Sequence, residues 1–254
     1  MKSVAKRARV LLSWAVLTVF VTWLLGYPSQ LAAQGSQGQD AVYNSSNGIV
    51  GSSSFIDASM FAVKNGTICS VIYSILQSPG YSARVIDARG IPGSTPPTSM
   101  TCASGTTPWS TNNNVNVLNV PSTILLPATS GATPTPIIIS TPWVIPSNTH
   151  LIGEGDGLGS SAATTIQVSG SFNTTPGYIM QFGSSAGASG ISVERLAIDG
   201  LGNSVNGIVN PNAGPNSYVD HVTLYQIRGT GLLVENNADG SGPYSNITFE
   251  IGNG

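Results

Sequence analysis

The sequence predicts an all-β fold of the β-solenoid type, and three observations carry this prediction. Charged residues make up 8 % of the 254 residues, against roughly 25 % in ordinary globular domains. Similar seven-residue segments recur near the C-terminus at offsets of 26 and 25 residues. Only one segment has the apolar spacing of an amphipathic helix. Stacked short strands explain all three, because charges stacked in register would repel each other.

The composition also excludes several classes of protein. The formal net charge is −2, so the chain lacks the basic surface that a nucleic-acid-binding protein needs. Charge-driven disorder requires low hydrophobicity and high net charge, whereas 41 % of the residues are hydrophobic. The chain is long enough to form one domain with a substantial core.

The first 34 residues have the order of a secretory signal peptide. A basic start over residues 2–9 is followed by an apolar run over 10–25 and by small residues up to Ala33. The run is shorter than the ~20 residues of a membrane-spanning helix, although an uncleaved anchor is the alternative. Cleavage leaves five basic and eleven acidic residues. We therefore expect a secreted protein, extracellular or periplasmic, with no stable membrane insertion after cleavage and no nucleic-acid partner.

The rest of the chain divides into a flexible polar leader, residues 35–54, and one domain, residues 55–254. Apolar residues over Thr67–Leu76 follow helical spacing, and Pro79 ends the helix. We expect this helix to cap the first coil of the solenoid, whose edges would otherwise be exposed. A long loop over 90–121, of a length that is usually functional or disordered, interrupts the later strands. Short β-type runs are expected at 84–88, 123–126, 136–140, 150–153, 164–168 and 178–182.

The two cysteines, Cys69 and Cys102, leave two possibilities open. In an oxidising compartment they can form a disulfide that closes a long loop, and two buried free thiols are the alternative. No Cys-x-x-Cys or His/Cys cluster is present, so we expect neither a metal site nor a cofactor. The glycine-rich segment 153–159 lacks the spacing of a nucleotide-binding loop and is predicted to be a wide turn.

The repeat near the C-terminus sets the register of the predicted coils. Segments 193–199, 219–225 and 244–250 align without gaps, and two apolar residues alternate with polar ones in each copy. A second strand recurs at 207–209 and 231–233. Periods of this length indicate a solenoid or propeller. An antiparallel sandwich is the structural alternative, but it does not predict copies that match in register.

Several segments resemble the pectate-lyase superfamily, in particular its polygalacturonase-related secreted proteins. They are 85–90 (VIDARG), 124–127 (ILLP), 143–155 (WVIPSNTHLIGEG), 195–200 (RLAIDG) and 229–233 (GTGLL). The resemblance implies the pectin-lyase fold, a right-handed parallel β-helix with an N-terminal capping helix, in a carbohydrate-active protein. It is specific for the fold and weak for the chemistry, because fold alone does not define a reaction.

The sequence also departs from the active members of that family. The Asn-Thr-Asp motif, the adjacent Asp pair, the Gly-His-Gly turn and the Arg-Ile-Lys run of polygalacturonases are missing, as are the clustered acids of a pectate-lyase calcium site. The chain stops directly after the strand at 244–250, whereas solenoids ordinarily end in a cap. We therefore expect an N-terminal fragment, with catalytic coils beyond Gly254, or a branch of the family with a different role.

The repeats place a set of polar residues on one predicted outer face. Asp199 and Glu250 are the candidate catalytic residues, two coils or about 9.6 Å apart, against ~6.5–9.5 Å in inverting glycosidases. An Asx-type turn is the alternative role of Asp199, and solvated surface positions are the alternative for the rest. The candidate substrate-binding residues, for stacking on a sugar or contacting a uronate, are Arg195, His221, Tyr225 and Asn246.

The sequence thus predicts a protein that acts on or binds an extracellular polysaccharide of the pectin or uronate type, either as a lyase or as a glycoside hydrolase. The alternative is a non-catalytic extracellular binding protein or a surface-structural β-solenoid, which the missing motifs favour. We expect the protein to be a monomer.

Overall fold

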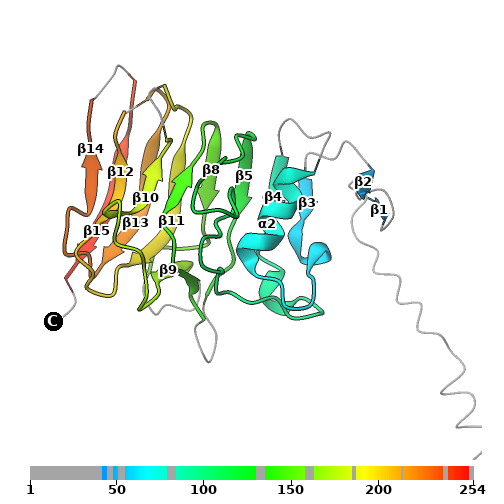
Figure 1. Cartoon of the computed structure of the whole chain (residues 1–254). Helices are drawn as coiled ribbons and strands as arrows, with labels where there is room; N and C mark the ends of the chain where they lie inside the picture. The colour runs from blue at the N-terminus through cyan, green and yellow to red at the C-terminus, as the bar shows by residue number, and fades with distance from the viewer. Residues whose placement is uncertain are drawn as a thin grey trace, which may run out of the picture. The chain divides into compact units, whose positions relative to one another are not determined.

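The chain folds into a parallel β-solenoid of about six turns (Figure 1). The computed structural model describes residues 55–78, 84–129, 135–157, 163–184, 187–212, 214–236 and 240–251, and the backbone of 42–44 and 48–50. Every pair of neighbouring strands from β3 onward is parallel. The predicted parallel β-helix is therefore confirmed, and the antiparallel sandwich is excluded.

The strands of each coil are distributed over two sheets. The larger sheet has nine strands, and the smaller sheet has four, in the order β14-β12-β10-β7. The larger sheet contains β3 (Phe55–Asp57), β4 (Arg84–Asp87), β5 (Ser122–Leu125), β6 (Ile137–Ile139), β8 (Thr149–Ile152), β9 (Thr165–Val168), β11 (Ser192–Asp199), β13 (Tyr218–Tyr225) and β15 (Tyr244–Glu250). The smaller sheet contains β7 (Trp143–Ile145), β10 (Tyr178–Phe182), β12 (Asn206–Asn210) and β14 (Leu232–Val234). All six predicted strands exist, and each of their ends lies within one residue of the predicted end.

The core consists of aliphatic ladders that run from coil to coil. One ladder crosses six strands of the larger sheet and is almost fully buried: Ile56, Ile86, Ile124, Leu151, Val193 and Val219. A second runs from β9 along the C-terminal halves of β11 and β13, through Ile166, Ile198 and Leu224, and ends at the exposed Phe249 of β15. Neighbouring strands lie ~4.8 Å apart, so each rung is in contact with the next. The register is the one that the repeats predict.

Each long strand bends sharply at one residue. Arg195, His221 and Asn246 occupy equivalent positions in β11, β13 and β15, and their φ angles are 53°, 51° and 53°. Left-handed backbone is uncommon for residues other than glycine, so its recurrence in three coils marks a defined corner of the solenoid. The first half of β11 pairs with β8 and the second half with β9, on the two sides of this corner. We call this column of residues the bend edge.

The helix α2 (Ile68–Gln77) begins within one residue of the predicted position. Thr67 caps it, accepting from the Ser70 backbone amide while the Ser70 hydroxyl bonds to the Thr67 amide, an arrangement that satisfies two of the amides left open at a helix start. Its apolar stripe is buried, and Figure 1 shows α2 beside β3 and β4, at the first coils. Two 3₁₀ turns flank this region, η1 (Ala58–Phe61) and η2 (Ile91–Gly93).

The segment expected to be a leader contains a short antiparallel strand pair, β1 (Val42–Asn44) with β2 (Gly48–Val50). The predicted signal peptide, residues 1–34, lies outside the described residues. Among the described helices, none combines the length and the apolar character required to cross a bilayer.

The long loop over 90–121 is packed against the solenoid. Trp109 is fully buried, and its ring meets that of Trp143 edge-on, with centroids 5.8 Å apart. Thr101 bridges to Ile138 of β6, and the Gly105 amide donates to the Thr141 hydroxyl at 2.8 Å. The loop thus contributes to the core at the coil that contains β6 and β7.

A disulfide joins α2 to this loop, from Cys69 to Cys102, which are 33 positions apart in sequence. A cross-link of this span stabilises a fold mainly by restricting the unfolded chain. We expect reduction to lower the free energy of unfolding by about 3 kcal/mol. Urea unfolding with and without reductant measures this, and the double variant Cys69→Ser/Cys102→Ser is the control that reductant should not affect. An unchanged wild-type midpoint after complete reduction would contradict the expectation.

Candidate functional site

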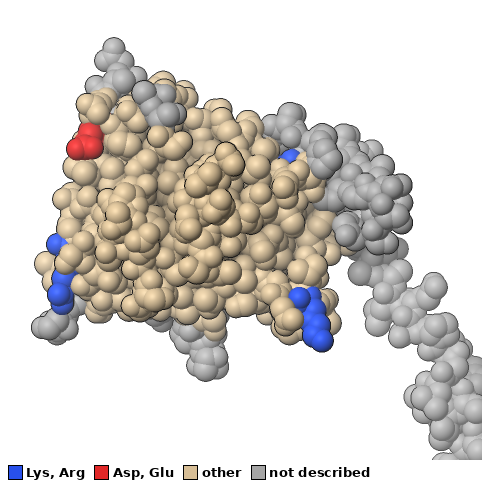
Figure 2. Space-filling model, in the orientation of Figure 1, with Lys and Arg blue, Asp and Glu red and all other residues tan. Residues whose placement is uncertain are grey.

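Charged side chains are unevenly placed on the solenoid. The four strands of the smaller sheet contain no Asp, Glu, Lys, Arg or His. In Figure 2 the visible face is almost free of charge, and its few charged groups lie at the margins. The charged strand residues that could act as acids or bases therefore lie on the larger sheet, whose outer face includes the bend edge.

Asp199, Tyr225 and Glu250 lie at matching positions of β11, β13 and β15, as the repeats predict. Asp199 pairs with Tyr225, and Tyr225 pairs with Glu250, on adjacent strands. Glu250 is exposed and Tyr225 is half-buried, its hydroxyl accepting a 3.3 Å bond from the Gln226 amide. The sequence analysis therefore placed these three residues correctly relative to each other.

The expectation that Asp199 lies on an exposed face is wrong. Asp199 is only 6 % exposed, and both of its carboxylate oxygens have partners. Oδ1 accepts from the Leu201 amide at 2.9 Å, and Oδ2 accepts from Gln167 Nε2 at 2.8 Å. The first bond is the Asx-type turn that the sequence left open as an alternative. Ala197 and Thr223, two positions before Asp199 and Tyr225 on the same strands, are buried as well.

The bend edge carries the other three candidates, and Arg195, His221 and Asn246 are all exposed. In a regular strand consecutive side chains point to opposite faces. A left-handed residue breaks this alternation, so that the bend residue and the residue before it both lie on the outside. The structure thereby places Glu194 beside Arg195, Asp220 beside His221, and Ser245 beside Asn246.

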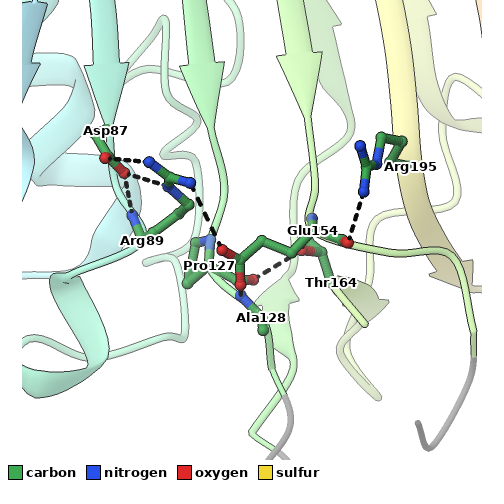
Figure 3. A network of polar contacts seen from close by, with 7 residues as sticks. All are labelled: Asp87, Arg89, Pro127, Ala128, Glu154, Thr164 and Arg195. Atoms are coloured by element: carbon green, nitrogen blue, oxygen red, sulfur yellow. Dashed lines mark hydrogen bonds and ion pairs between the residues drawn. The ribbon is translucent and has the colours of Figure 1, made fainter. Parts of the chain in front are cut away.

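A hollow of about 250 Å³ lies against this edge. It is lined by Leu125, Leu126, Ile152 and Gly153, of which Leu126 and Gly153 are buried, and its rim carries Arg89, Glu154 and Arg195. Figure 3 shows the rim, with Arg89 and Glu154 approaching one another and Arg195 above the backbone of Glu154. Apolar side chains with a few convergent polar groups are the common lining of a small-molecule site.

The three charged groups of the rim are not equivalent. Arg89 forms a two-pronged pair with Asp87, at 2.8 and 2.7 Å, and this hydrogen bonding holds the pKa of the Asp87 carboxyl below its ordinary value. Glu154 accepts from the Ala128 amide at 3.1 Å and lies 3.9 Å from Arg89 Nη1. Among the described residues, Arg195 donates one long bond, 3.5 Å, to the Glu154 carbonyl (Figure 3). Its side chain is exposed and forms no ion pair with a described residue, so it is the rim cation best able to bind an anion.

A second polar cluster surrounds Asp220 on the next coil. Oδ1 of Asp220 accepts from the Ser245 hydroxyl at 2.7 Å and from Asn246 Nδ2 at 2.9 Å, and Oδ2 lies 2.8 Å from His221 Nδ1. These bonds favour the ionised carboxylate. Led by the bond from Ser245, they lower the pKa of Asp220 to about 2.

We expect Ser245→Ala to raise the pKa of Asp220 from about 2 toward its ordinary value of 3.8, because the largest of the lowering bonds is lost. Thr248→Ala, on the exposed part of the same strand, is the control. Because the folded-state pKa is depressed, the stabilisation by these bonds is present above the ordinary pKa and is lost as the pH falls through about 2. A carboxyl-carbon NMR titration measures the shift, and identical titration curves in the two variants would refute it.

A third cluster ties β8, β11 and β13 together. Glu194 Oε1 accepts from the Ser192 hydroxyl at 2.6 Å and from the Tyr218 hydroxyl at 2.8 Å, while Ser192 Oγ lies 2.8 Å from His150 Nδ1. Burial, followed by the bond to Glu194, raises the pKa of Tyr218. Ser192 is fully buried and donates its proton to Glu194, so it is not placed as a nucleophile. We regard this cluster as structural.

Arg89 and Asp220 are not among the site residues that the sequence predicts, and neither is Glu154 as part of the rim. A signal for Asp220 was present, because the buried apolar residues Val193 and Leu196 are three positions apart, an odd spacing that a regular strand does not allow. The same spacing recurs at Val219 and Val222. In the described part of the chain no three His, Cys, Asp or Glu side chains come together in a way that could hold a metal ion.

No family model, curated protein or solved structure matches the chain. Fold and geometry therefore define its class: a parallel β-solenoid with a polar bend edge and a small hollow beside it.

Proposed function

We propose that the protein is a secreted, monomeric β-helix protein of the pectate-lyase superfamily that binds an acidic extracellular polysaccharide, and that the hollow at the bend edge receives one sugar unit. The observation that carries the proposal is the hollow itself, which combines the partly exposed aliphatic side chains of Leu125 and Ile152 with a rim of two guanidinium groups and one carboxylate. A sugar ring offers an apolar face to the aliphatic side chains, and its hydroxyl groups can both donate to Glu154 and accept from the arginines.

Arg195 is the reason for proposing an acidic sugar as the ligand. Arg195 is exposed and makes one long hydrogen bond to the described residues, whereas Arg89 is already paired with Asp87. Arg is the side chain suited to two-pronged recognition of a carboxylate. The volume of about 250 Å³ lies below the range of roughly 300–1,000 Å³ for drug-sized ligands, which agrees with a single sugar ring.

Arg195→Ala should weaken binding of polygalacturonate or alginate by roughly 10- to 100-fold, because a hydrogen-bonded charge pair contributes about 1.5–3 kcal/mol. Titration calorimetry on the full-length protein measures the affinity. Arg228→Ala, which removes an exposed arginine outside the hollow, is the matched control and should bind as the wild type does. A wild-type protein that binds no uronate polymer would overturn the proposal, and so would an Arg195→Ala variant with wild-type affinity.

A non-catalytic role as a surface binding protein is the second candidate. It is favoured by the burial of Asp199, which is committed to a turn and to Gln167. Asp199→Ala tests whether Asp199 takes part in ligand binding: because it removes both hydrogen bonds of the carboxylate, we expect it to destabilise the turn after β11 and to leave uronate affinity unchanged.

A further inference from the structure

Glu154 is the one acid among the described residues that line the hollow, and two other segments of the chain hold it in place. Its amide donates to the Thr164 hydroxyl at 2.9 Å, and that hydroxyl donates to the Pro127 carbonyl at 2.9 Å (Figure 3). Its carboxylate oxygen Oε2 accepts from the Ala128 amide at 3.1 Å. Because the backbone and the side chain are both held, the carboxylate has a fixed position on the rim.

The second carboxylate oxygen of Glu154 is available to a ligand. Oε1 lies 3.9 Å from Arg89 Nη1, which is longer than a hydrogen bond, and the side chain is 37 % exposed. An ionised carboxylate only accepts hydrogen bonds, and each of its oxygens can accept more than one. Oε1 can therefore accept from the hydroxyl groups of a sugar in the hollow, but it has nothing to offer a group without a proton to donate.

The charges of the rim favour a ligand with one negative group. Arg195 is exposed and forms no ion pair with a described residue, so it is the cation that a ligand carboxylate can reach. Arg89 stands between two carboxylates, those of Asp87 and Glu154, and is already bonded to the first. Its surroundings therefore do not favour a further anion. In a hollow of about 250 Å³, a second negative group on the same ring would lie close to the Glu154 carboxylate, and like charges brought together in this way disfavour a ligand.

We propose that Glu154 determines the specificity of the hollow: its carboxylate accepts hydrogen bonds from free hydroxyl groups of a bound uronate ring and excludes a ring that carries a second negative group, such as a sulfate ester. The proposal rests on the proposed function, because it requires a uronate carboxylate at Arg195. The ligand class is a polysaccharide with one carboxylate per ring and unsulfated hydroxyl groups. Specific sites commonly combine attraction of one ligand with repulsion of its competitors.

Glu154→Gln separates the charge of this residue from its shape. The side-chain amide has nearly the same shape as the carboxylate, and its oxygen can still accept from the Ala128 amide. The contacts of the Glu154 backbone with Thr164 and Arg195 do not involve the side chain and are retained. We therefore expect the variant to unfold at nearly the wild-type urea concentration, so that a change in ligand preference reports the lost charge.

The test uses three short oligogalacturonides of equal length, measured by titration calorimetry on the full-length protein. The first is unsubstituted, the second is O-sulfated on its ring hydroxyls, and the third is O-acetylated at the same positions. Acetylation removes the hydroxyl donors and adds bulk without adding charge, so it separates these effects from repulsion. Glu235→Gln, which removes an exposed carboxylate outside the hollow, is the matched control for the change in net charge.

We expect the wild type to bind the sulfated oligomer roughly 100-fold more weakly than the unsubstituted one, with the acetylated oligomer between them. In Glu154→Gln the ratio of the affinities for the unsubstituted and sulfated oligomers should fall at least about 10-fold, whereas Glu235→Gln should keep the wild-type ratio. In the wild type the same ratio should narrow between about 0.1 and 1 M salt, as the Debye length falls from ~10 to ~3 Å. This salt dependence is a second measurement that requires no variant.

The outcomes distinguish this proposal from the proposed function. A wild type that binds the unsubstituted oligomer, loses this binding in Arg195→Ala and keeps its preference in Glu154→Gln refutes the role of Glu154 and leaves the binding function standing. Equal wild-type affinity for the sulfated and unsubstituted oligomers, or equal rejection of the acetylated and sulfated ones, also refutes that role. A wild type that binds none of the three oligomers refutes both proposals.

Discussion

Trp143→Ala should lower the free energy of unfolding by about 3–5 kcal/mol, as is typical for removing a large aromatic side chain from a core. Trp143 is 1 % exposed and begins β7, the first strand of the smaller sheet, where it pairs in register with Met180. Its ring also meets that of Trp109 edge-on at 5.8 Å. The substitution therefore removes contacts to the next coil and to the long loop at once. Urea or thermal unfolding measures the loss.

Two further variants make this prediction specific. Trp143→Phe keeps an aromatic ring in the same space and should cost much less than Trp143→Ala. A double-mutant cycle with Trp109→Ala should give a coupling of about 0.5–1.5 kcal/mol, the usual value for an aromatic pair. Additive losses in the two single variants would show that the loop and β7 are not coupled through these rings.

The repeat made the coil register predictable. Once segments 193–199, 219–225 and 244–250 are aligned, every paired position follows, and the structure has the same pairs. The capping helix was predictable for a similar reason, since its apolar spacing and its stop signal are both local. In each case the physical cause of the structure lies in the residues of the segment itself.

The position of the candidate site was much less predictable, because it depends on departures from regular strand geometry. Strict alternation places Asp199 outside, and the left-handed bend at Arg195 changes which residues reach the surface. Glycine would have indicated such a bend, but arginine, histidine and asparagine occupy it. The partners Arg89 and Glu154 come from turns that follow β4 and β8, and no periodic pattern determines how turns approach each other.

The packing of the loop over 90–121 was also not predictable from the sequence. Its composition indicated an irregular segment, and a buried Trp109 within it could not be anticipated from local spacing. Its attachment to the solenoid depends on contacts with residues far along the chain, such as the hydrogen bond from the Asn114 side-chain amide to the Pro142 carbonyl at 2.8 Å. Long-range packing of this kind leaves no periodic signal in the sequence.

Gly153→Ala tests the link between the fold and the candidate site, and it should be among the most damaging small substitutions in the chain. A Cβ added at Gly153 would lie 2.3 Å from the Arg195 carbonyl oxygen and 2.7 and 2.9 Å from the Cβ atoms of Thr164 and Leu196. The Gly153 amide also donates to the Glu194 carbonyl at 2.9 Å, which fixes the two strands against each other. These neighbours are backbone or Cβ atoms and cannot move aside as flexible side-chain ends would. We expect a loss of about 3 kcal/mol in the free energy of unfolding, the upper part of the range for overpacking.

The same clash should also disturb ligand binding, because Gly153 lines the hollow and lies close to the backbone of Arg195. Moving β11 away from β8 shifts the Arg195 guanidinium relative to Glu154, so uronate affinity should fall even under conditions where the variant remains folded. Gly170→Ala is the matched control: an added Cβ meets no atom within 4 Å there, and its effect should stay within about 0.5 kcal/mol. If Gly153→Ala unfolds at the same urea concentration as Gly170→Ala, the close approach of β8 and β11 is not what fixes the bend edge. If it is destabilised but binds uronate polymers with wild-type affinity, the ligand does not occupy this hollow.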